Sequence, residues 1–365
     1  MAASRILIRI ALFFWLIAKV ISYKVWLTAR IFPVVPVFDF LAGTPAYVHV
    51  FLYSFSLFCL LVLTIKPDFR IVGTALLVSE ILSASLDYMR WQPWEYEYLF
   101  ILLIYILNKK NEKFISVIAF MLIALYAYSG IHKLNHGFLV QIWDNMMLRS
   151  LGHFHISHQG SKLFYLGYLL GITELIAAIG LIFKNTRIYA AIVLIIMHLF
   201  NLYWLGPLGM NYNVVVWPWN IAMICFLYLV FIAQKEILLT DAFKGLNILV
   251  PFFWGLMPAF NFVNCWDHYL SGSLYSGKLT LMGICVDTRA APELAQFVSP
   301  NDVYHMCEGK SLVKLQSWSL KELNVPPYPE YRVYQKINKT LKTKYAAINC
   351  FTYHFGSNKN IHDLN

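Results

Sequence analysis

Long apolar segments recur through the first 263 residues of the chain, and few charged residues interrupt them. Charged residues make up 13% of the sequence, whereas ordinary soluble domains contain roughly 25%. A single water-soluble domain of 365 residues has too little interior to bury an apolar fraction of 59%. The same composition excludes a disordered chain, a collagen and a coiled coil. The sequence therefore predicts an integral membrane protein whose main surroundings are the lipid bilayer.

The apolar segments have the length of membrane-spanning helices. A window of about 19 residues finds about nine of them, although Glu95–Leu107 is short and the last segment contains two prolines. We expect an all-α polytopic membrane helix bundle over residues 1–263 and a small C-terminal α+β extramembrane domain over residues 264–365. The predicted spans are Ile6–Ser22, Ala46–Ile65, Ile71–Leu86, Glu95–Leu107, Phe114–His132, Leu163–Phe183, Ile188–Gly206, Val214–Ala233 and Ile248–Val263.

The first apolar segment allows two interpretations. Arg5 and Arg9 precede an apolar stretch, which is typical of a secretory signal peptide. Lys19 follows that stretch, however, and no small-x-small pattern marks a cleavage site. We therefore interpret the segment as a retained membrane anchor.

The positions of Lys and Arg indicate the orientation of the spans. With a cytoplasmic N-terminus, the inner segments carry 11 of these residues and the outer loops carry 7 over a greater length. Cytoplasmic loops are enriched in Lys and Arg, so this bias favours a cytoplasmic N-terminus. Nine spans then place the C-terminal domain outside. The abundance of Lys, Asn, Ile, Phe and Tyr favours a bacterial inner membrane, with that domain in the periplasm, over an endoplasmic reticulum.

The composition changes near residue 264, where polar residues become frequent and no further span is possible. Lys278–Val286 and Leu312–Ser317 are typical of strands, and Ala291–Phe297 and Glu330–Lys342 are typical of helices. An outer domain of this kind offers a surface for an extracytoplasmic protein or peptide partner. The lysines of this region alternate with acidic and apolar residues, so the net charge of +10 indicates no nucleic-acid partner.

Four of the six cysteines fall in the expected outer domain. In an oxidising compartment they indicate one or two disulfides, for which three full pairings are possible, and buried free thiols are the alternative. No CxxC spacing occurs, so a zinc site is not predicted. The disulfide candidates are Cys265, Cys285, Cys307 and Cys350.

Ionisable and amide side chains inside predicted spans are the first candidates for function, because such groups are costly in lipid. Glu174 lies near the middle of the sixth span, and His198 lies inside the seventh. Asn201 follows His198 by three residues, so both side chains can face one partner. The structural alternative is that these groups form hydrogen bonds that hold packed helices together.

The predicted outer ends of the spans carry further candidates. The segment LDYMRWQPWEYEYLF contains Asp87, Arg90, Trp91 and Trp94, of which the first two can pair with each other. Its aromatic residues also fit an interfacial belt. Lys133 ends the fifth predicted span in YAYSGIHKLNHGF. A lysine at this depth can extend to the lipid headgroups, or it can act as a base if it is desolvated.

Motifs for other chemistries are absent from the sequence. No Walker loop, GxGxxG, HExxH or GxSxG pattern occurs. His153, His155 and His158 have a spacing that fits a metal site, but they lack acidic or thiolate neighbours. We therefore predict no metal.

Three segments, in order, resemble motifs of the HTTM family, the membrane domain shared with vitamin K-dependent γ-glutamyl carboxylase. They are LDYMRWQPWEYEYLF, YAYSGIHKLNHGF, and TELIAAIGLIFKNTR followed by MHLFNLYWLGPLG, and together they cover about residues 46–233. The resemblance implies that Lys133 is the base that deprotonates a vitamin K-like hydroquinone. The acidic position of the family falls on Glu174, and its histidine and asparagine positions fall on His198 and Asn201.

The resemblance also has departures. Trp94 stands where the carboxylase has a histidine, which removes one titratable group from the implied site. Only about 100 residues follow the last span, whereas the carboxylase has a large lumenal part that binds its protein substrate. The implied cofactor is a quinone or hydroquinone, whose ring can be enclosed by aromatic side chains such as Trp91, Trp94, Tyr126 and Tyr128.

Three functions follow from these patterns. The first is a carboxylase-like or quinone-linked membrane enzyme, in which Lys133, His198 and Glu174 are catalytic and Asn201, Asp87, Arg90, Trp91 and Trp94 bind the ligand. The second is a non-enzymatic membrane component whose outer domain binds a partner. The third, a transporter, requires two repeats with broken helices, and the sequence shows no repeat.

Overall fold

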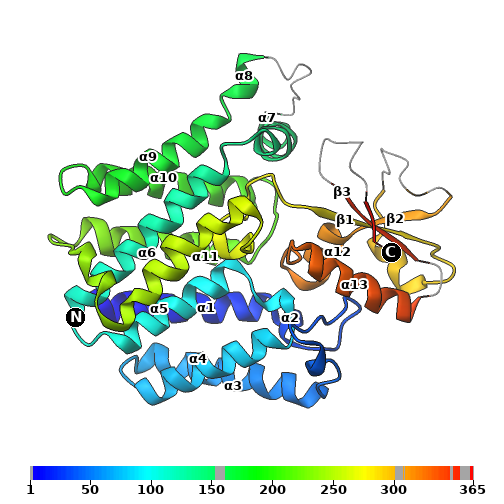
Figure 1. Ribbon diagram of the computed structural model, residues 1–365, viewed down its shortest axis with the longest axis horizontal. Helices are drawn as coiled ribbons and strands as arrows, with labels where there is room; N and C mark the ends of the chain where they lie inside the picture. The colour runs from blue at the N-terminus through cyan, green and yellow to red at the C-terminus, as the bar shows by residue number, and fades with distance from the viewer. Residues whose placement is uncertain are drawn as a thin grey trace.

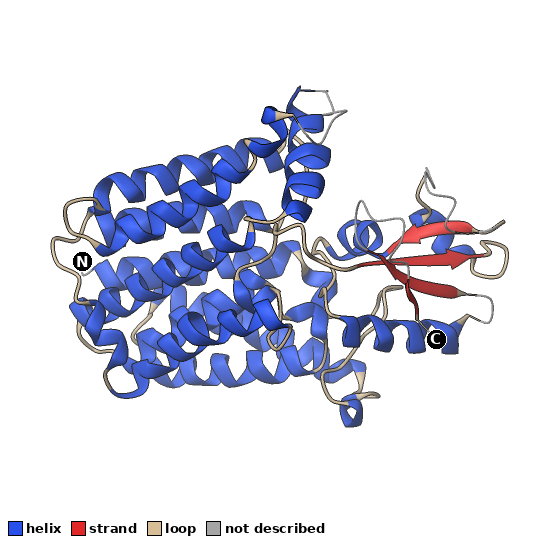
Figure 2. Cartoon of the chain, turned by 45° about the horizontal axis from the view of Figure 1, so that its top comes forward, coloured by secondary structure: helices blue, strands red, loops and turns tan. Residues whose placement is uncertain are grey.

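The computed structural model shows a bundle of helices with a small antiparallel sheet at one end (Figure 1). The structure describes residues 3–152, 161–300, 307, 309–345, 348–353 and 362–364. The bundle helices lie side by side, and the N-terminus and the sheet are at opposite ends of the molecule (Figure 2). A helical membrane bundle is therefore the main architecture of the chain.

Each of the predicted spans is helical over most of its length. The helices of the first half are α1 (Ala3–Ile21), α2 (Tyr23–Trp26), α3 (Ala46–Ile65), α4 (Arg70–Ser85), α5 (Pro93–Leu107) and α6 (Asn111–His132). A π-helix (Phe138–Leu148) then precedes α7 (Arg149–Gly152), α8 (Lys162–Tyr165), α9 (Tyr168–Ile182), α10 (Arg187–Leu205) and α11 (Val216–Leu227). α11 continues as a π-helix (Tyr228–Ile232), and a further π-helix (Pro251–Leu256) and a 3₁₀ helix (Met257–Val263) end the bundle.

Length and composition identify membrane-spanning helices within the described residues. Five helical segments are long and apolar enough to cross a membrane: Ala46–Ile65, Asn111–His132, Lys162–Ile182, Arg187–Leu205 and Gly245–Val263. α5 is shorter, and its 15 residues extend for only about 22 Å. It lies inside the bundle, with residues such as Tyr98, Ile101 and Ile104 buried. An inner helix needs less apolar length because its neighbours, and not lipid, surround it.

Contacts between distant segments define the two ends of the bundle. At the first end, Arg5 pairs with Asp68 at 2.9 Å, and the Asn108 amide donates to Asn247 over 2.9 Å. At the other end, the Ile31 N–H donates to Glu322 Oε1 over 2.6 Å. The second end is where the sheet-bearing region rests on the bundle.

The sheet has the strand order β2-β1-β3-β4, with all pairs antiparallel. Its strands are β1 (Leu281–Val286), β2 (Ser311–Lys314), β3 (Asn349–Tyr353) and β4 (His362–Asp363). In the register, Gly283 of the central strand β1 lies opposite Lys314 on one side and Phe351 on the other. The region also contains a 3₁₀ helix (Pro292–Phe297), α12 (Leu315–Leu323) and α13 (Tyr331–Lys344). The region therefore combines helices and strands.

The second predicted strand, Leu312–Ser317, is wrong at its C-terminal half. β2 ends at Lys314, and Leu315 begins α12. The buried residues of α12 are Leu315, Trp318, Ser319, Glu322 and Leu323. Their spacing of three, four, seven and eight residues from Leu315 is that of one helix face, and this period decides the structure.

One disulfide forms in the sheet-bearing region. Cys285 on β1 is bonded to Cys307, with a Cα–Cα distance of 5.3 Å. The structure therefore has one of the one or two disulfides expected, and the other two candidates carry free thiols: Cys265 is exposed and Cys350 is buried. Cys350 packs in the main core, whereas Cys285 and Cys307 form a separate small cluster with Leu312. The Cys350 thiol and the Cys285–Cys307 disulfide therefore lie in different hydrophobic clusters.

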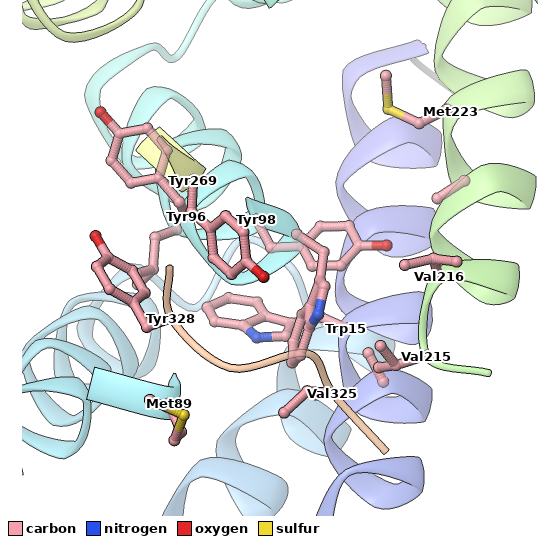
Figure 3. Close-up of a cluster of buried hydrophobic side chains, with 14 of the residues drawn as sticks. Trp15, Met89, Tyr96, Tyr98, Val215, Val216, Met223, Tyr269, Val325 and Tyr328 are labelled. Atoms are coloured by element: carbon pink, nitrogen blue, oxygen red, sulfur yellow. The ribbon is translucent and has the colours of Figure 1, made fainter. Parts of the chain in front are cut away.

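The main hydrophobic core continues from the bundle into the sheet-bearing region. Figure 3 shows Trp15 of α1 and Tyr98 of α5 in one cluster with Tyr269, Val325 and Tyr328, which follow the last span. The rings of Tyr269 and Tyr328 are 5.4 Å apart in an edge-to-face contact. The Tyr328 ring also lies 5.5 Å from the ring of Tyr88 in the bundle, so aromatic side chains pack the two regions together.

Candidate functional site

Two glycines bring α6 and α9 into backbone contact. A Cβ atom at Gly130 would lie 2.8 Å from the Gly171 carbonyl oxygen, and one at Gly171 would lie 2.8 Å from the Gly130 carbonyl oxygen. Small residues allow such close crossings between membrane helices. Lys133 and Glu174 each follow their glycine by three residues, so both lie close to the crossing point. There the Lys133 ammonium donates to Glu174 Oε2.

The Lys133–Glu174 ion pair is largely shielded from solvent. The Glu174 side chain is 3% exposed and the Lys133 side chain is 19% exposed. The ammonium also donates to Ser129 Oγ over 2.7 Å, one turn earlier on α6. Lys133 is therefore held by two partners and remains the more accessible member of the pair.

His198 on α10 forms a second polar group close by. Its Nε2 lies 2.8 Å from the Tyr126 hydroxyl, and its Nδ1 lies 2.7 Å from Asn220 Oδ1. The Asn220 amide nitrogen donates to the Val216 carbonyl, which identifies Oδ1 as the acceptor for the histidine. His198 therefore carries its proton on Nδ1, and Nε2 accepts from Tyr126.

A cavity of about 130 Å³ joins these groups. An engineered apolar cavity of roughly 150 Å³ binds benzene, so the space admits one six-membered ring. The cavity lies between α6, α9, α10, α11 and the segment after the last span. Its lining includes Tyr126, Ser129, Lys133, Phe138, Ile142, Met147, Glu174, His198, Asn201, Trp204, Trp219, Asn220, Trp254, Tyr269 and Tyr275.

Asn201 lies on the cavity wall with its polar atoms open. Within the described residues its side chain makes no hydrogen bond, whereas both ring nitrogens of His198 are occupied. The two residues were expected to share a partner, but His198 instead bonds to α6 and α11. Asn201 therefore presents free donors and an acceptor to a ligand, and His198 orients Tyr126.

Asp87 and Arg90 are not part of this cavity. The pairing between them that the sequence allows does not form, because Asp87 is paired with Arg30. The Arg90 guanidinium donates to the carbonyl oxygens of Val25, Trp26 and Ser83 at 2.9–3.1 Å. Both side chains are fully buried, so they act as structural ties between the loops at this end of the bundle.

The two tryptophans of the same segment also lie away from the cavity. Trp94 is buried, and its ring meets the ring of Trp26 edge to face at 6.5 Å. Trp91 is half-buried and packs against the main core. The predicted role of these rings as walls for a ligand is not seen, and their neighbour Pro93 lines the cavity instead.

Some residues of the site were not predicted from the sequence. Asn220 and Trp219 lie on α11, whose sequence VWPWNIAMICFL holds one amide among apolar residues. The Trp219 indole donates to Glu97 Oε2 over 2.7 Å, and Glu97 is buried on α5. Asn220 is a lone polar group in an apolar helix, which is the signal that selected Glu174 and His198.

The proposed histidine triplet cannot be placed. His153, His155 and His158 lie outside the described residues. Over the part of the chain that the structure describes, no three His, Cys, Asp or Glu side chains converge on a possible metal site. The candidate site thus consists of an ion pair, a histidine network and an aromatic cavity.

No protein-family model, curated protein or solved structure matches the chain. The resemblance to the HTTM family therefore rests on the three sequence motifs alone. What the site can do chemically is inferred below from its own geometry.

Proposed function

We propose that the protein is a membrane enzyme linked to a quinone or hydroquinone, and that it is related to the HTTM family. The observation that carries this proposal is the convergence of Lys133, Glu174 and Asn201 on one ring-sized cavity. Aromatic side chains such as Trp219 and Trp254 line the same space. A lipid with a polar ring and an apolar tail suits a cavity that lies inside a membrane bundle and is lined in this way.

The ion pair supplies the proton acceptor. When a ring fills the cavity and removes water, the separated charges of Lys133 and Glu174 lose hydration. This favours transfer of the ammonium proton to the carboxylate, which leaves a neutral amine. With a hydroquinone bound, this amine would be the group that receives the proton of a ring hydroxyl. Asn201 is placed to donate a hydrogen bond to a ring oxygen.

The aromatic and amide groups hold the ring in position. Tyr126 bonds to His198, which bonds in turn to Asn220, and all three side chains line the same cavity as the ion pair. A bound quinone would supply the redox chemistry. The protein contributes orientation, exclusion of water and a group that receives a proton.

We further propose nine spans, a cytoplasmic N-terminus and a periplasmic C-terminal region at a bacterial inner membrane. The positive residues Arg5, Arg9, Lys109 and Lys110 lie at the end of the bundle opposite the sheet, in support of this orientation. The Cys285–Cys307 disulfide suits an oxidising compartment. The alternative remains a non-enzymatic component whose outer region binds a protein or peptide.

The test is Lys133→Ala and Glu174→Gln in the purified full-length protein, with Lys109→Ala as the matched control on an exposed lysine. We expect a quinone-class lipid to co-purify with the parent, and quinol turnover to fall by about 10²–10⁴-fold in both site variants. Lipid binding should persist, since the aromatic wall is unchanged. Unchanged turnover in Lys133→Ala, or the absence of any ring lipid from the parent by mass spectrometry, would overturn the proposal.

A further inference from the structure

A second cavity lies beside the first, between the bundle and the sheet-bearing region. It has a volume of about 210 Å³, and it shares Ile142, Tyr269, Leu274 and Tyr275 with the first cavity as a common wall. Its other walls come from the π-helix Phe138–Leu148, the loop before α11, and the turn from β2 into α12. The cavity is therefore at the sheet end of the bundle, away from the lipid-facing helices.

The polar groups of this second cavity are those of a binding site. Asn213 is buried, with 5% exposed, and its Oδ1 atom has no hydrogen-bond partner among the described residues. Its amide nitrogen is used, because it donates to the Tyr275 hydroxyl over 3.1 Å. A buried carbonyl oxygen without a partner is destabilising, and a ligand donor would satisfy it.

Two tyrosine hydroxyls offer donors to the same space. Tyr275 accepts from Asn213, and Tyr212 accepts from Gln316 over 3.2 Å, so the hydroxyl protons of both remain available. Burial raises the pKa of Tyr212 and of Tyr275, which keeps both hydroxyls protonated at neutral pH. Both groups are therefore donors to a ligand.

One cation and no carboxylate line the second cavity among the described residues. Lys314, the last residue of β2, is half-buried, and its ammonium has no acidic partner in the described part of the chain. A cation with two hydroxyl donors favours an anion. The volume exceeds that of an inorganic anion, and the free acceptor on Asn213 disfavours a ligand that carries only acceptor oxygens.

We propose that this second cavity binds a small organic anion from the aqueous phase, a carboxylate with a hydroxyl group beside it. The carboxylate is bound by Lys314 and the tyrosine hydroxyls, and the adjacent donor bonds to Asn213 Oδ1. The common wall places this ligand next to the ring cavity. The site does not depend on the proposed quinone chemistry, because its own lining defines it.

Binding is measured by calorimetry on the full chain in lipid nanodiscs, with lactate and glycolate as probes. We expect saturable binding of at least one probe, and binding about tenfold or more weaker in Lys314→Gln, which loses the cation. Asn213→Asp adds a negative charge at the same shape and should weaken binding by a similar factor. Lys339→Gln on the exposed face of α13 is the charge-matched control and should bind as the parent does.

The outcomes separate this proposal from its alternatives. Propionate, which lacks the neighbouring donor, should bind about tenfold more weakly than lactate. The proposal is overturned if neither probe binds, if sulfate competes as well as lactate, or if folded Lys314→Gln and Asn213→Asp, checked by their melting temperatures, bind like the parent. The experiment measures binding of the anion and not quinol turnover. A negative result would therefore overturn the anion site and leave the quinone proposal standing.

Discussion

Lys19 shows how single charged residues are accommodated inside the bundle. Its side chain is fully buried, 2.7 Å from Glu80 and 4.0 Å from Glu95. The ammonium also lies 3.1 Å from the centre of the Trp26 ring. Glu95 in turn accepts a hydrogen bond of 2.6 Å from the Trp15 indole. One cation is therefore shared by two carboxylates from different helices.

Replacing Lys19 by methionine should destabilise the protein strongly. The change keeps the length of the side chain but leaves Glu80 and Glu95 buried without a cation, a situation that costs about 3–5 kcal/mol. Thermal unfolding in detergent measures the effect. The matched control is Lys66→Met on an exposed lysine, for which we expect a change within about 0.5 kcal/mol.

A rescue variant distinguishes charge from packing at this position. If the unpaired carboxylates cause the loss, adding Glu80→Gln and Glu95→Gln to Lys19→Met should restore much of the stability. An equally unstable triple variant would show that the loss comes from packing around Trp26, and it would contradict the electrostatic explanation.

At the scale of the helices, the crossing of α6 and α9 controls the distance between Lys133 and Glu174. Gly130→Ala places a methyl group 2.8 Å from backbone atoms of α9, which cannot give way as a flexible side chain would. We expect destabilisation by about 1–3 kcal/mol and loss of quinol turnover. Gly255→Ala is the control, because its new Cβ meets only the Phe120 ring at ordinary contact distance.

At the control position, Gly255, we expect the change in stability to have the opposite sign. Alanine is favoured over glycine within a helix by roughly 0.5–1 kcal/mol, so Gly255→Ala should be neutral or stabilising. If Gly130→Ala were as stable and as active as Gly255→Ala, close backbone contact would not be what positions the ion pair.

Two carboxylates bind lysines of α13, and their protonation at low pH should destabilise the fold. Lys336 bonds to Asp39 and Lys344 bonds to Glu293, each at 2.7 Å. These hydrogen bonds lower the pKa of both carboxyls below their ordinary values of 3.8 and 4.5. A carboxyl with a lowered folded-state pKa stabilises the fold above its unfolded-state pKa, and this contribution disappears as the pH falls through the folded-state pKa.

The melting temperature should therefore fall more steeply below about pH 4.5 in the parent than in an Asp39→Asn, Glu293→Gln double variant. At pH 7 the variant should melt at a lower temperature, and the two curves should converge toward pH 2–3. Differential scanning fluorimetry between pH 2.5 and 7 provides the comparison. Parallel curves over this range would show that neither carboxyl is responsible for the acid response.

The helices of the bundle were predictable from the sequence, whereas most contacts between them were not. Apolar runs located Ala46–Ile65 to the residue, because a span must satisfy its own backbone within lipid. Lone polar groups selected Lys133, Glu174 and His198, which do meet at one cavity. Trp94 was misassigned because an aromatic near a predicted helix end fits a ligand pocket, an interfacial belt and a buried core equally well.

The paired spacing of the glycines could have located the site more sharply. Gly130 precedes Lys133 by three residues, and Gly171 precedes Glu174 by three residues. Together the two patterns indicate a close helix crossing with a charged group at each side. By contrast, the partners of Lys19 come from α4 and α5, and such long-range pairs depend on the packing of the whole bundle.

At the scale of the whole molecule, the bundle and the sheet-bearing region are stabilised together. Glu322 of α12 accepts from the backbone N–H groups of Ile31 and Phe32, over 2.6 and 2.9 Å, and the Asn324 amide donates to the Ile21 carbonyl over 2.9 Å. Tyr269 and Tyr328 are buried against aromatic residues of the bundle (Figure 3). Separating the two regions would expose these rings and leave buried polar groups without partners.

We therefore expect one cooperative thermal transition for the two regions, measured by differential scanning calorimetry in nanodiscs and followed in parallel by tryptophan fluorescence. Glu322→Gln removes the charge that binds two N–H groups. It should lower the midpoint temperature of this single transition, by an amount that corresponds to a loss of about 1–3 kcal/mol in the free energy of unfolding. The exposed Glu236→Gln is the matched control and should leave it unchanged. Two separate transitions, with only one moved by Glu322→Gln, would mean that the regions unfold independently. The residues that the two cavities share would then form a contact between independently folding units. Such a contact would not fix the position of one ligand site relative to the other.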